Sequence, residues 1–346
     1  MILKKHFIYI ASFMLAATLS GRQSARAQDI HFSQFFEAPL LRNPSLAGIF
    51  TGDYRIQAVF RDQWSSFTNA YRTGSLNGEY KMPIGKSNDF LTLGLQFLYD
   101  KAGTAALSTT ELLPAVNYHK SLSDERVMYL SLGFMGGLVE KRIDMSKVTT
   151  NSQYNGTAFD PALPDGEVLT NPTIRYLDGS LGISFNSSFG QNKGNTLFFG
   201  FGMHHINRPK NNFYKTSIEL APKYVLSAGV KMIVNENAYF TIQGDHTRQG
   251  SSQETIGGAL ISYKLGDDPE NSNYIVSLGG FLRWKDALIP VVKLEMNSLA
   301  VALSYDVNVS QLKTVSQGRG GVELSLSYIG FLDRENKKFR ILCPKF

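Results

Sequence analysis

The sequence has a single cysteine, Cys343, among 346 residues. One thiol excludes an internal disulfide framework, so this thiol is either free or paired between chains. No cysteine lies near the start of the chain, where a lipoprotein would carry its acyl group. The sequence therefore excludes both a disulfide-stapled secreted domain and a lipoprotein.

The sequence also lacks an apolar run long enough for a membrane-spanning helix. Its longest candidate, Phe7 to Leu19, is shorter than the ~20 residues that such a helix needs. This run follows a basic start and precedes Ala25-Arg26-Ala27, a small-x-small cleavage site. We predict that residues 1–27 are a signal peptide and that the mature chain begins at Gln28; the alternative is an uncleaved membrane anchor.

The chain has little excess charge once this signal is removed. The precursor carries a net charge of +6, and four of its basic residues, Lys4, Lys5, Arg22 and Arg26, lie in the predicted signal. Without them, 31 of the 35 basic residues remain against 29 acidic ones. No basic cluster with interleaved aromatic residues stands out elsewhere, so nucleic acid is not an expected partner.

Alternation of apolar and polar residues is what the sequence has in abundance. In the segment Phe90 to Asp100, Leu91, Leu93, Leu95, Phe97 and Tyr99 share one face of a strand, and the other face is polar except for Leu98. Successive side chains of a strand point to opposite faces. Such a strand suits a boundary between hydrocarbon and a polar interior.

Fourteen segments show this pattern, an even number as bacterial single-chain barrels require. They are Tyr54–Arg61, Arg72–Lys81, Phe90–Lys101, Leu107–Lys120, Arg126–Lys141, Tyr176–Ser187, Asn195–His205, Pro222–Val234, Ala238–Thr247, Thr255–Leu265, Tyr274–Lys285, Leu288–Asn297, Leu299–Val307 and Val322–Ile329. The 16 Tyr and 23 Phe suit aromatic girdles at the membrane interfaces. We predict an all-β outer-membrane barrel of about 14 antiparallel strands; the alternative is a secreted all-β protein with its apolar faces in a core.

The chain is predicted to have an extra segment at each end of the barrel. Residues 28–50 form an N-terminal periplasmic arm or plug, residues 51–330 the barrel, and residues 331–346 a C-terminal periplasmic tail. An even strand count places both barrel ends on the periplasmic side. We expect the apolar arm to pack against the barrel or plug its lumen; the alternative is docking onto a periplasmic partner.

The connections predict the orientation of the barrel. Those around 86–88, 190–194 and 235–237 are short and turn-like, whereas Arg142–Thr173 and Asn207–Ile218 are longer. Barrels of this kind keep short turns in the periplasm and long loops outside. The two long connections are therefore the expected external binding surface.

The sequence offers no recognisable catalytic or metal-binding motif. His204 and His205 are adjacent in a predicted strand, so they should point to opposite faces and cannot share a metal ion. The stretch from Asp160 to Glu167 holds three carboxylates, which is either a weak calcium site or, by default, a solvated loop. We expect no catalytic residues, no metal and no cofactor. Glycines within strands, such as Gly200 and Gly202, indicate bends or close approach of another backbone.

Four motifs resemble those of one family. The N-terminal stretch Gln28-Asp29-Ile30-His31-Phe32-Ser33-Gln34-Phe35-Phe36, followed by Pro39-Leu40, Asn43-Pro44 and Ala47-Gly48, is similar to Q-D-P-x-F-S-Q-Y, P-L, N-P-A and A-G. Arg61-Asp62-Gln63-Trp64 resembles R-N-Q-W, His205-Ile206-Asn207-Arg208-Pro209 resembles H-x-N-x-P, and Cys343-Pro344-Lys345-Phe346 resembles C-P-[RK]-F. Ile30, Phe35 and Ser45 depart conservatively. Together these motifs resemble the PorP/SprF family of Bacteroidetes outer-membrane proteins.

This resemblance implies a barrel of the type IX secretion and gliding apparatus. It implies a non-enzymatic protein that binds, and helps to export or anchor, a secreted adhesin or other type IX cargo. The expected partners are that cargo, outer-membrane lipid, and the periplasmic ring and peptidoglycan-binding components. The alternative function is an outer-membrane pore for small solutes. The residues that carry the family motifs, and are predicted to bind partners, are Phe32, Ser33, Gln34, Asn43, Pro44, Gly48, Arg61, Gln63, Trp64, Asn207, Pro209, Cys343, Pro344 and Phe346.

Overall fold

The computed structural model describes most of the chain after residue 28. It covers residues 29–64, 70–85, 88–123, 125–164, 166, 171–190, 194–213, 218–266, 272–310 and 316–332. The predicted signal peptide and the motif from Cys343 to Phe346 lie outside the described residues. Within the described residues, no helix has both the length and the apolarity to cross a bilayer.

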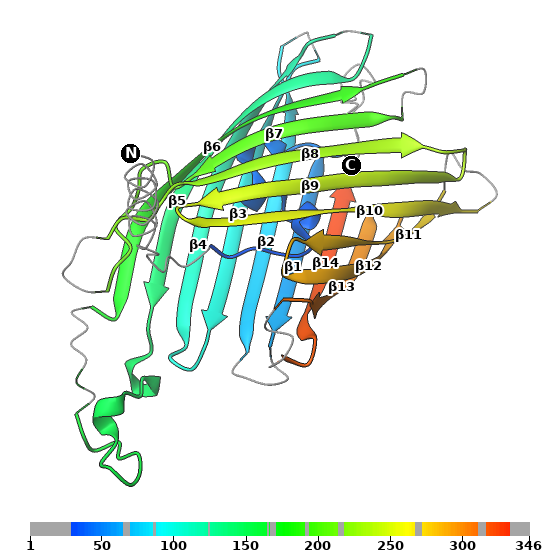
Figure 1. Cartoon of the computed structure of the whole chain (residues 1–346). Coiled ribbons are helices and arrows are strands. Elements are labelled where there is room, and N and C mark those ends of the chain that lie inside the picture. Colours follow the sequence, from blue (N-terminus) through cyan, green and yellow to red (C-terminus); the bar gives the residue numbers. More distant parts are fainter. Residues whose placement is uncertain are drawn as a thin grey trace, which may run out of the picture.

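Fourteen strands form a closed antiparallel barrel (Figure 1), which confirms the predicted fold class. They are β1 (Tyr54–Gln63), β2 (Tyr71–Pro83), β3 (Phe90–Ala102), β4 (Leu107–Ser121), β5 (Met128–Arg142), β6 (Thr173–Ser188), β7 (Thr196–His204), β8 (Lys223–Ile233), β9 (Ala238–Gln249), β10 (Ser252–Leu265), β11 (Tyr274–Arg283), β12 (Ala287–Met296), β13 (Leu299–Asn308) and β14 (Arg319–Gly330). Each strand pairs with its neighbours in sequence, and β1 pairs with β14. Closure leaves no free edge within the hydrocarbon, where unpaired backbone groups would be costly.

The alternating pattern separates the two faces of the barrel wall. In β3, Leu95 and Phe97 face outward and are exposed, whereas Thr92 and Gln96 face inward and are buried. Leu98 also points inward, so here an apolar side chain stands on the otherwise polar face. There it packs in an apolar cluster with Phe32, which precedes the barrel in sequence. This apolar residue on the inward face of β3 is thus part of an internal contact.

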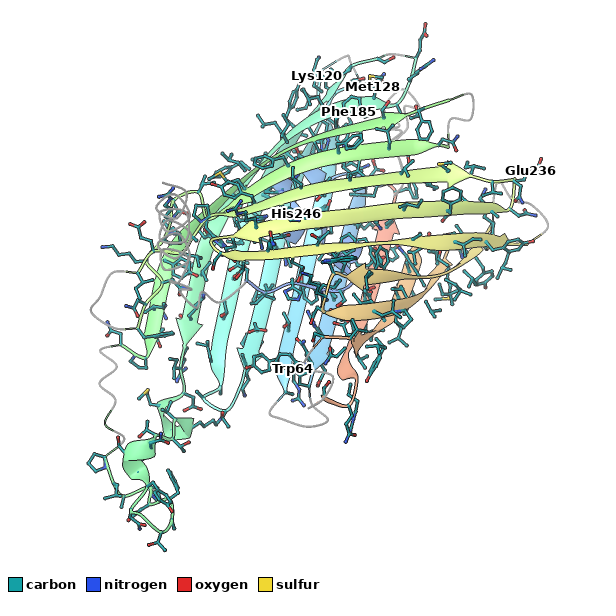
Figure 2. All side chains as sticks on the ribbon, viewed as in Figure 1. Trp64, Lys120, Met128, Phe185, Glu236 and His246 are labelled. Carbon is teal, nitrogen blue, oxygen red and sulfur yellow. The ribbon has the colours of Figure 1, made fainter. Side chains whose placement is uncertain are left out.

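The barrel has two distinct ends. We call the end where β1 begins and β14 ends the terminal end, and the opposite one the distal end. The short connections after β2, β4, β6 and β8 lie at the terminal end, and the connection of residues 143–172 lies at the distal end. In Figure 2, Lys120, Met128 and Glu236 lie toward the terminal end and Trp64 lies at the distal end. Long loops of such barrels face the cell exterior, so we predict that the distal end faces outside.

Residues 29–50, which we call the lumenal segment, run through the interior of the barrel. The segment contains three short helical turns, η1 (Phe35–Glu37), α2 (Pro39–Arg42) and η2 (Pro44–Leu46), and strands enclose it in Figure 1. Leu40 and Ala47 are fully buried. Apolar side chains of the segment pack against inward-facing ones such as Leu113 and Met135.

The lumenal segment is not confined to one end of the barrel. Asp29 contacts Gln249, at the distal end of β9, whereas the backbone of Asp53 bonds to Gly330 at the terminal end. The segment therefore spans the lumen from the distal to the terminal end. An even strand count determines where the barrel strands start and finish, but it does not constrain a segment that passes inside them.

Candidate functional site

Buried carboxylates of the barrel wall hold the first part of the lumenal segment. The backbone N–H groups of Ser33 and Gln34 each donate to an oxygen of Glu323, both at 2.7 Å. Arg61 lies 3.3 Å from Glu323 and 3.1 Å from Asp306. All five residues are buried. A buried charge is tolerated when it is paired and hydrogen-bonded, so these contacts make the position of the segment specific.

Two ion pairs hold the middle of the segment. Lys293 Nζ lies 2.6 Å from a carboxylate oxygen of Glu37, at the end of η1. The Arg42 guanidinium, at the end of α2, donates to both oxygens of Asp245 at 2.8 and 2.6 Å. It also lies 4.7 Å from the ring centroid of Phe35. A bidentate arginine–carboxylate pair sets orientation as well as distance.

The next turn of the segment lies against inward-facing glycines of the wall. A Cβ added to Gly133 would lie 2.5 Å from the carbonyl carbon of Pro44, and one added to Gly182 would overlap the side chain of Asn43. A Cβ added to Gly202 would meet the carbonyl oxygen of Arg42 at 3.0 Å. These strand positions therefore need glycine because the backbone of η2 approaches the wall closely.

Neutral amide and hydroxyl groups complete this contact. The Asn43 side chain accepts from the backbone N–H of Ser45 at 2.9 Å and so caps η2. Asn117, on β4, donates its amide to the carbonyl oxygens of Ser45 and Ala47 at 2.7 and 2.8 Å. The Ser184 hydroxyl also donates to the Ser45 carbonyl at 3.0 Å. The wall thus satisfies the exposed backbone of the turn without a charge.

Gly48 of the Ala47-Gly48 motif needs the conformational freedom of glycine. Its φ is +84°, and an added Cβ would collide with the side chain of Thr92. Its backbone N–H donates to Glu79 at 2.6 Å. The motif therefore fits a sharp bend that brings the segment against β2 and β3.

A cavity of about 430 Å³ lies at the distal end, and we call it the distal vestibule. It is bordered by the start of the lumenal segment and by strand ends. Charged and aromatic side chains around it include Asp29, Arg61, Trp64, Tyr71, Glu111, Lys141, Tyr176, Asp178, His205 and Lys223. The vestibule therefore combines charged groups with flat aromatic surface.

His205 joins the lumenal segment to the vestibule wall. Its two ring nitrogens lie 2.6 Å from a carboxylate oxygen of Asp29 and 2.7 Å from one of Asp178. Burial lowers the pKa of His205, but these carboxylates outweigh it and raise that pKa to about 9. Burial alone would raise the pKa of the Asp29 carboxyl. The nearby positive charges of Lys223 and His205 have a larger effect and hold this pKa well below its ordinary value. The ion pair is therefore formed at neutral pH.

The structure corrects the prediction that His204 and His205 face opposite ways. β7 ends at His204, and His205 has a φ of +57°, which breaks the strand alternation. Both side chains are buried, and His204 contacts the Arg42 carbonyl oxygen of the lumenal segment at 3.2 Å. By contrast, Asp245 and His246 on β9 do alternate: Asp245 binds Arg42 inside, and His246 contacts Thr255 on the other face (Figure 2).

Asn207 of the H-x-N-x-P motif pairs with a strand edge. Its side-chain amide donates to the Leu177 carbonyl oxygen at 2.7 Å, and its side-chain oxygen accepts from the Gly179 N–H at 3.2 Å. This side chain replaces the backbone of β7 beyond the point where that strand ends. Pro209, two residues on, is buried.

The structure brings most of the predicted motif residues into two groups. Phe32, Ser33, Gln34 and Arg61 lie in the distal half of the lumen. Asn43 and Pro44 lie along the glycine-lined wall, and Gly48 lies at the bend against β2 and β3. Gln63 and Trp64 end β1 at the distal rim, where the Trp64 ring meets that of Tyr71 edge-on at 5.0 Å. Contacts within the chain therefore account for the buried motif residues; their binding to a partner stays a prediction.

Sequence reasoning missed the groups on the wall that receive the segment. They are Glu79, Asn117, Asp245, Lys293, Asp306 and Glu323. Each occupies an inward position of a predicted strand, so the available signal was a charged or amide side chain on the polar face. That signal does not reveal which group meets which part of the segment.

The acidic stretch from Asp160 to Glu167 shows no assembled metal site in the described residues. No cluster of three His, Cys, Asp or Glu side chains is found among them. Asp160 instead accepts from the backbone N–H of Ala162 at 2.9 Å. Asp165 and Glu167 lie outside the described residues.

Comparison with known proteins identifies the family. Residues 24–328 match the type IX secretion system membrane protein PorP/SprF family. The chain therefore belongs to this family, as its motifs predicted, and is an outer-membrane protein. No curated protein matches the sequence.

The chain is also similar, at low identity, to several solved structures. The Ralstonia pickettii toluene transporter TbuX is 8% identical, with 86% of this chain and 94% of that one covered and a TM-score of 0.48. The deltaS2 mutant of the monoaromatic hydrocarbon channel TodX is 10% identical, with 84% and 93% covered and a TM-score of 0.47. The translocator domain of the autotransporter NalP from Neisseria meningitidis is 11% identical, with 92% and 97% covered and a TM-score of 0.42.

Proposed function

We propose that this protein is a closed outer-membrane receptor of the type IX system that binds a secreted surface protein at its distal end. The observation that carries the proposal is the occupied lumen. Residues 29–50 span the interior and are held there by buried ion pairs and by the glycine-lined wall. A barrel filled in this way suits a binding or anchoring role better than the alternative role of an open pore.

The distal end has the features of a binding surface. The vestibule opens there beside charged and aromatic groups, and the connection between β5 and β6 projects from the same end (Figure 1). Its described part includes η3 (Met145–Lys147) and η4 (Asn151–Gln153), and Tyr154 and Phe159 are exposed on it. Exposed aromatic side chains on a projecting loop are common anchors in protein interfaces.

The domain division follows as part of the same proposal. Residues 28–50 act as a plug, residues 51–330 as the barrel and residues 331–346 as a tail on the terminal side, where periplasmic components of the secretion system would meet it. The backbone N–H of Leu332 donates to Asp53 at 2.7 Å, so the start of the tail adjoins the terminal end.

The test is affinity purification of the tagged protein from native outer membranes, with mass spectrometry of the proteins that accompany it. In one variant, residues 145–164 are replaced by a short Gly-Ser linker. In the matched control, the turn of residues 235–237 at the terminal end is replaced in the same way. We expect a surface protein with a type IX sorting domain to accompany the wild type and the control, and its recovery to fall at least about tenfold for the loop variant.

Conductance in planar bilayers distinguishes the pore alternative. We expect the wild type to be silent and a variant that lacks residues 29–48 to conduct, because the deletion empties the lumen. A barrel purified alone in mild detergent, together with steady wild-type conductance, would refute the receptor and favour the pore.

A further inference from the structure

The distal part of β6 lacks a neighbouring strand on one side. β6 has 16 residues and pairs with β5 from Thr173 to Ser187. On its other side it pairs with β7 only from Ser180 onward, since β7 has nine residues and ends at His204. In Figure 1, β5 and β6 continue past the end of β7 toward the projecting connection. The stretch Thr173–Gly179 therefore has an edge on the β7 side.

The backbone direction identifies which groups line this edge. The Gly179 carbonyl oxygen accepts from Ile206 at 3.0 Å, so the backbone groups of Gly179 face the β7 side. Backbone N–H and C=O groups point to the same side at every second residue, so those of Leu177, Arg175 and Thr173 face that side too. Pro172 fits this alternation, because its carbonyl oxygen accepts from Ile143 of the β5 side at 2.9 Å.

Among the described residues, partners are found only for the lower part of this edge. The Asn207 side chain takes the Leu177 carbonyl oxygen and the Gly179 N–H. Beyond it, in the part of the chain that the structure describes, no backbone or side-chain group bonds to the outward edge of Arg175 or Thr173. With respect to the described residues, the outward N–H and C=O groups of Arg175 and Thr173 are thus available in strand geometry.

The free edge lies where the lipid-facing band of the wall ends. On the outer face, Leu138 and Leu177 are exposed and apolar, but the next pair toward the distal end is Glu140 and Arg175, whose charged atoms lie 2.6 Å apart. An unpaired sheet edge is not stable within hydrocarbon. At a polar interface, by contrast, such an edge is a ready template for an added strand.

We propose that the edge of β6 from Thr173 to Leu177 binds an extended segment of the secreted surface protein as an added β-strand. This inference rests on the proposed receptor function and names how the partner is held. The occupant must be an extended chain, because only a strand offers N–H and C=O groups at the spacing of Arg175 and Thr173. Alternate side chains of that strand would face the vestibule, near Tyr176 and Asp178, and the apolar outer face near Leu177.

A proline substitution can remove a backbone donor of this edge without removing the hydrogen bonds between β5 and β6. Arg175→Pro removes the N–H that faces the gap and leaves the bonds between β5 and β6 intact, since the groups of Arg175 point away from β5. Arg175→Ala is the matched control, because it removes the same side chain but keeps the N–H. We expect recovery of the surface protein that accompanies the wild type to fall about tenfold in Arg175→Pro and to stay within about twofold in Arg175→Ala.

Hydrogen–deuterium exchange of wild-type protein supplies an independent measurement if the proline variant fails to form a heat-resistant barrel. We expect the amides of residues 173–177 to exchange at least about tenfold more slowly in the purified complex than in the isolated barrel. Equal recovery with the proline variant, or equal exchange in the two states, would overturn strand addition and leave the receptor function standing. Recovery of no surface protein with the wild type would overturn both.

Discussion

The two halves of the lumenal segment are held in the barrel by different kinds of interaction. Residues 29–42 include Asp29, Glu37 and Arg42, each of which is paired with an opposite charge on the wall. Residues 43–50 carry no charged side chain. They contact the wall through the Asn43 amide, through close packing against glycines and through backbone groups, two of which bond to Glu79 and Lys81 of the wall. The distal half should therefore respond to pH and charge, and the terminal half to side-chain volume.

This difference suits a segment that is fixed at one end and adjustable at the other. The terminal half leads directly into β1 and is locked by shape. The distal half borders the vestibule, where a ligand could compete for its ion pairs.

The largest effect should come from removal of the carboxylate that anchors the distal half. Glu323→Ala leaves the buried N–H groups of Ser33 and Gln34 without their acceptor and removes one of the two carboxylates beside Arg61, so we expect the free energy of unfolding to fall by about 3–5 kcal/mol. Urea unfolding in lipid vesicles, followed by tryptophan fluorescence, measures it. The control is Glu140→Gln, whose exposed pair with Arg175 should contribute less than about 1 kcal/mol. Equal losses would mean that Glu323 does not anchor the segment.

Alkaline pH should weaken the distal half next. The pKa of His205 is raised in the folded protein to about 9, from an ordinary value of 6.5. Its stabilising contribution is therefore complete below about pH 6.5 and disappears as the pH rises through about 9. We expect the wild type to lose about 2–3 kcal/mol more than His205→Gln over this interval. Parallel pH profiles of the two proteins, measured by the same urea titration, would contradict the ion pair with Asp29 and Asp178.

The terminal half should respond to a single methyl group. Gly182→Ala places a Cβ against the Asn43 side chain, and we expect a loss of about 1–3 kcal/mol together with faster proteolysis of residues 29–50. The matched control is Gly78→Ala, because an added Cβ there meets nothing within 4 Å. If both variants behaved alike, the close approach of η2 to the wall would not be important for stability. This change should be insensitive to pH, in contrast to the distal half.

The strand pattern was predictable because it depends on local alternation. All fourteen predicted segments correspond to strands, and the start of β9 at Ala238 and of β13 at Leu299 agree with the predicted positions. The main differences are at strand ends. β6 begins at Thr173, where the prediction placed Tyr176, and β7 ends at His204 because His205 takes a left-handed conformation. Strand ends depend on the partner strand and on single dihedral angles, which periodicity does not report.

For the interior, the sequence predicted that contacts exist but not which residues form them. The apolar character of Phe32, Leu40 and Leu41 indicated that residues 28–50 pack against something, and inward glycines indicated close approach of a backbone. The matching of Ser33 with Glu323, or of Arg42 with Asp245, joins residues 290 and 203 positions apart. No local pattern encodes such a pair, since many inward positions of the fourteen strands carry suitable groups.

The sequence by itself determined the barrel, because each strand must present one apolar and one polar face and this requirement is written residue by residue. It also determined the family, through short motifs at both ends and between strands. Only the tertiary structure decided that the N-terminal segment runs from the distal to the terminal end, that His205 turns inward, and that β6 extends beyond the end of β7. These features arise from contacts between distant residues, whose energies depend on the closed barrel and not on any neighbouring stretch of the chain.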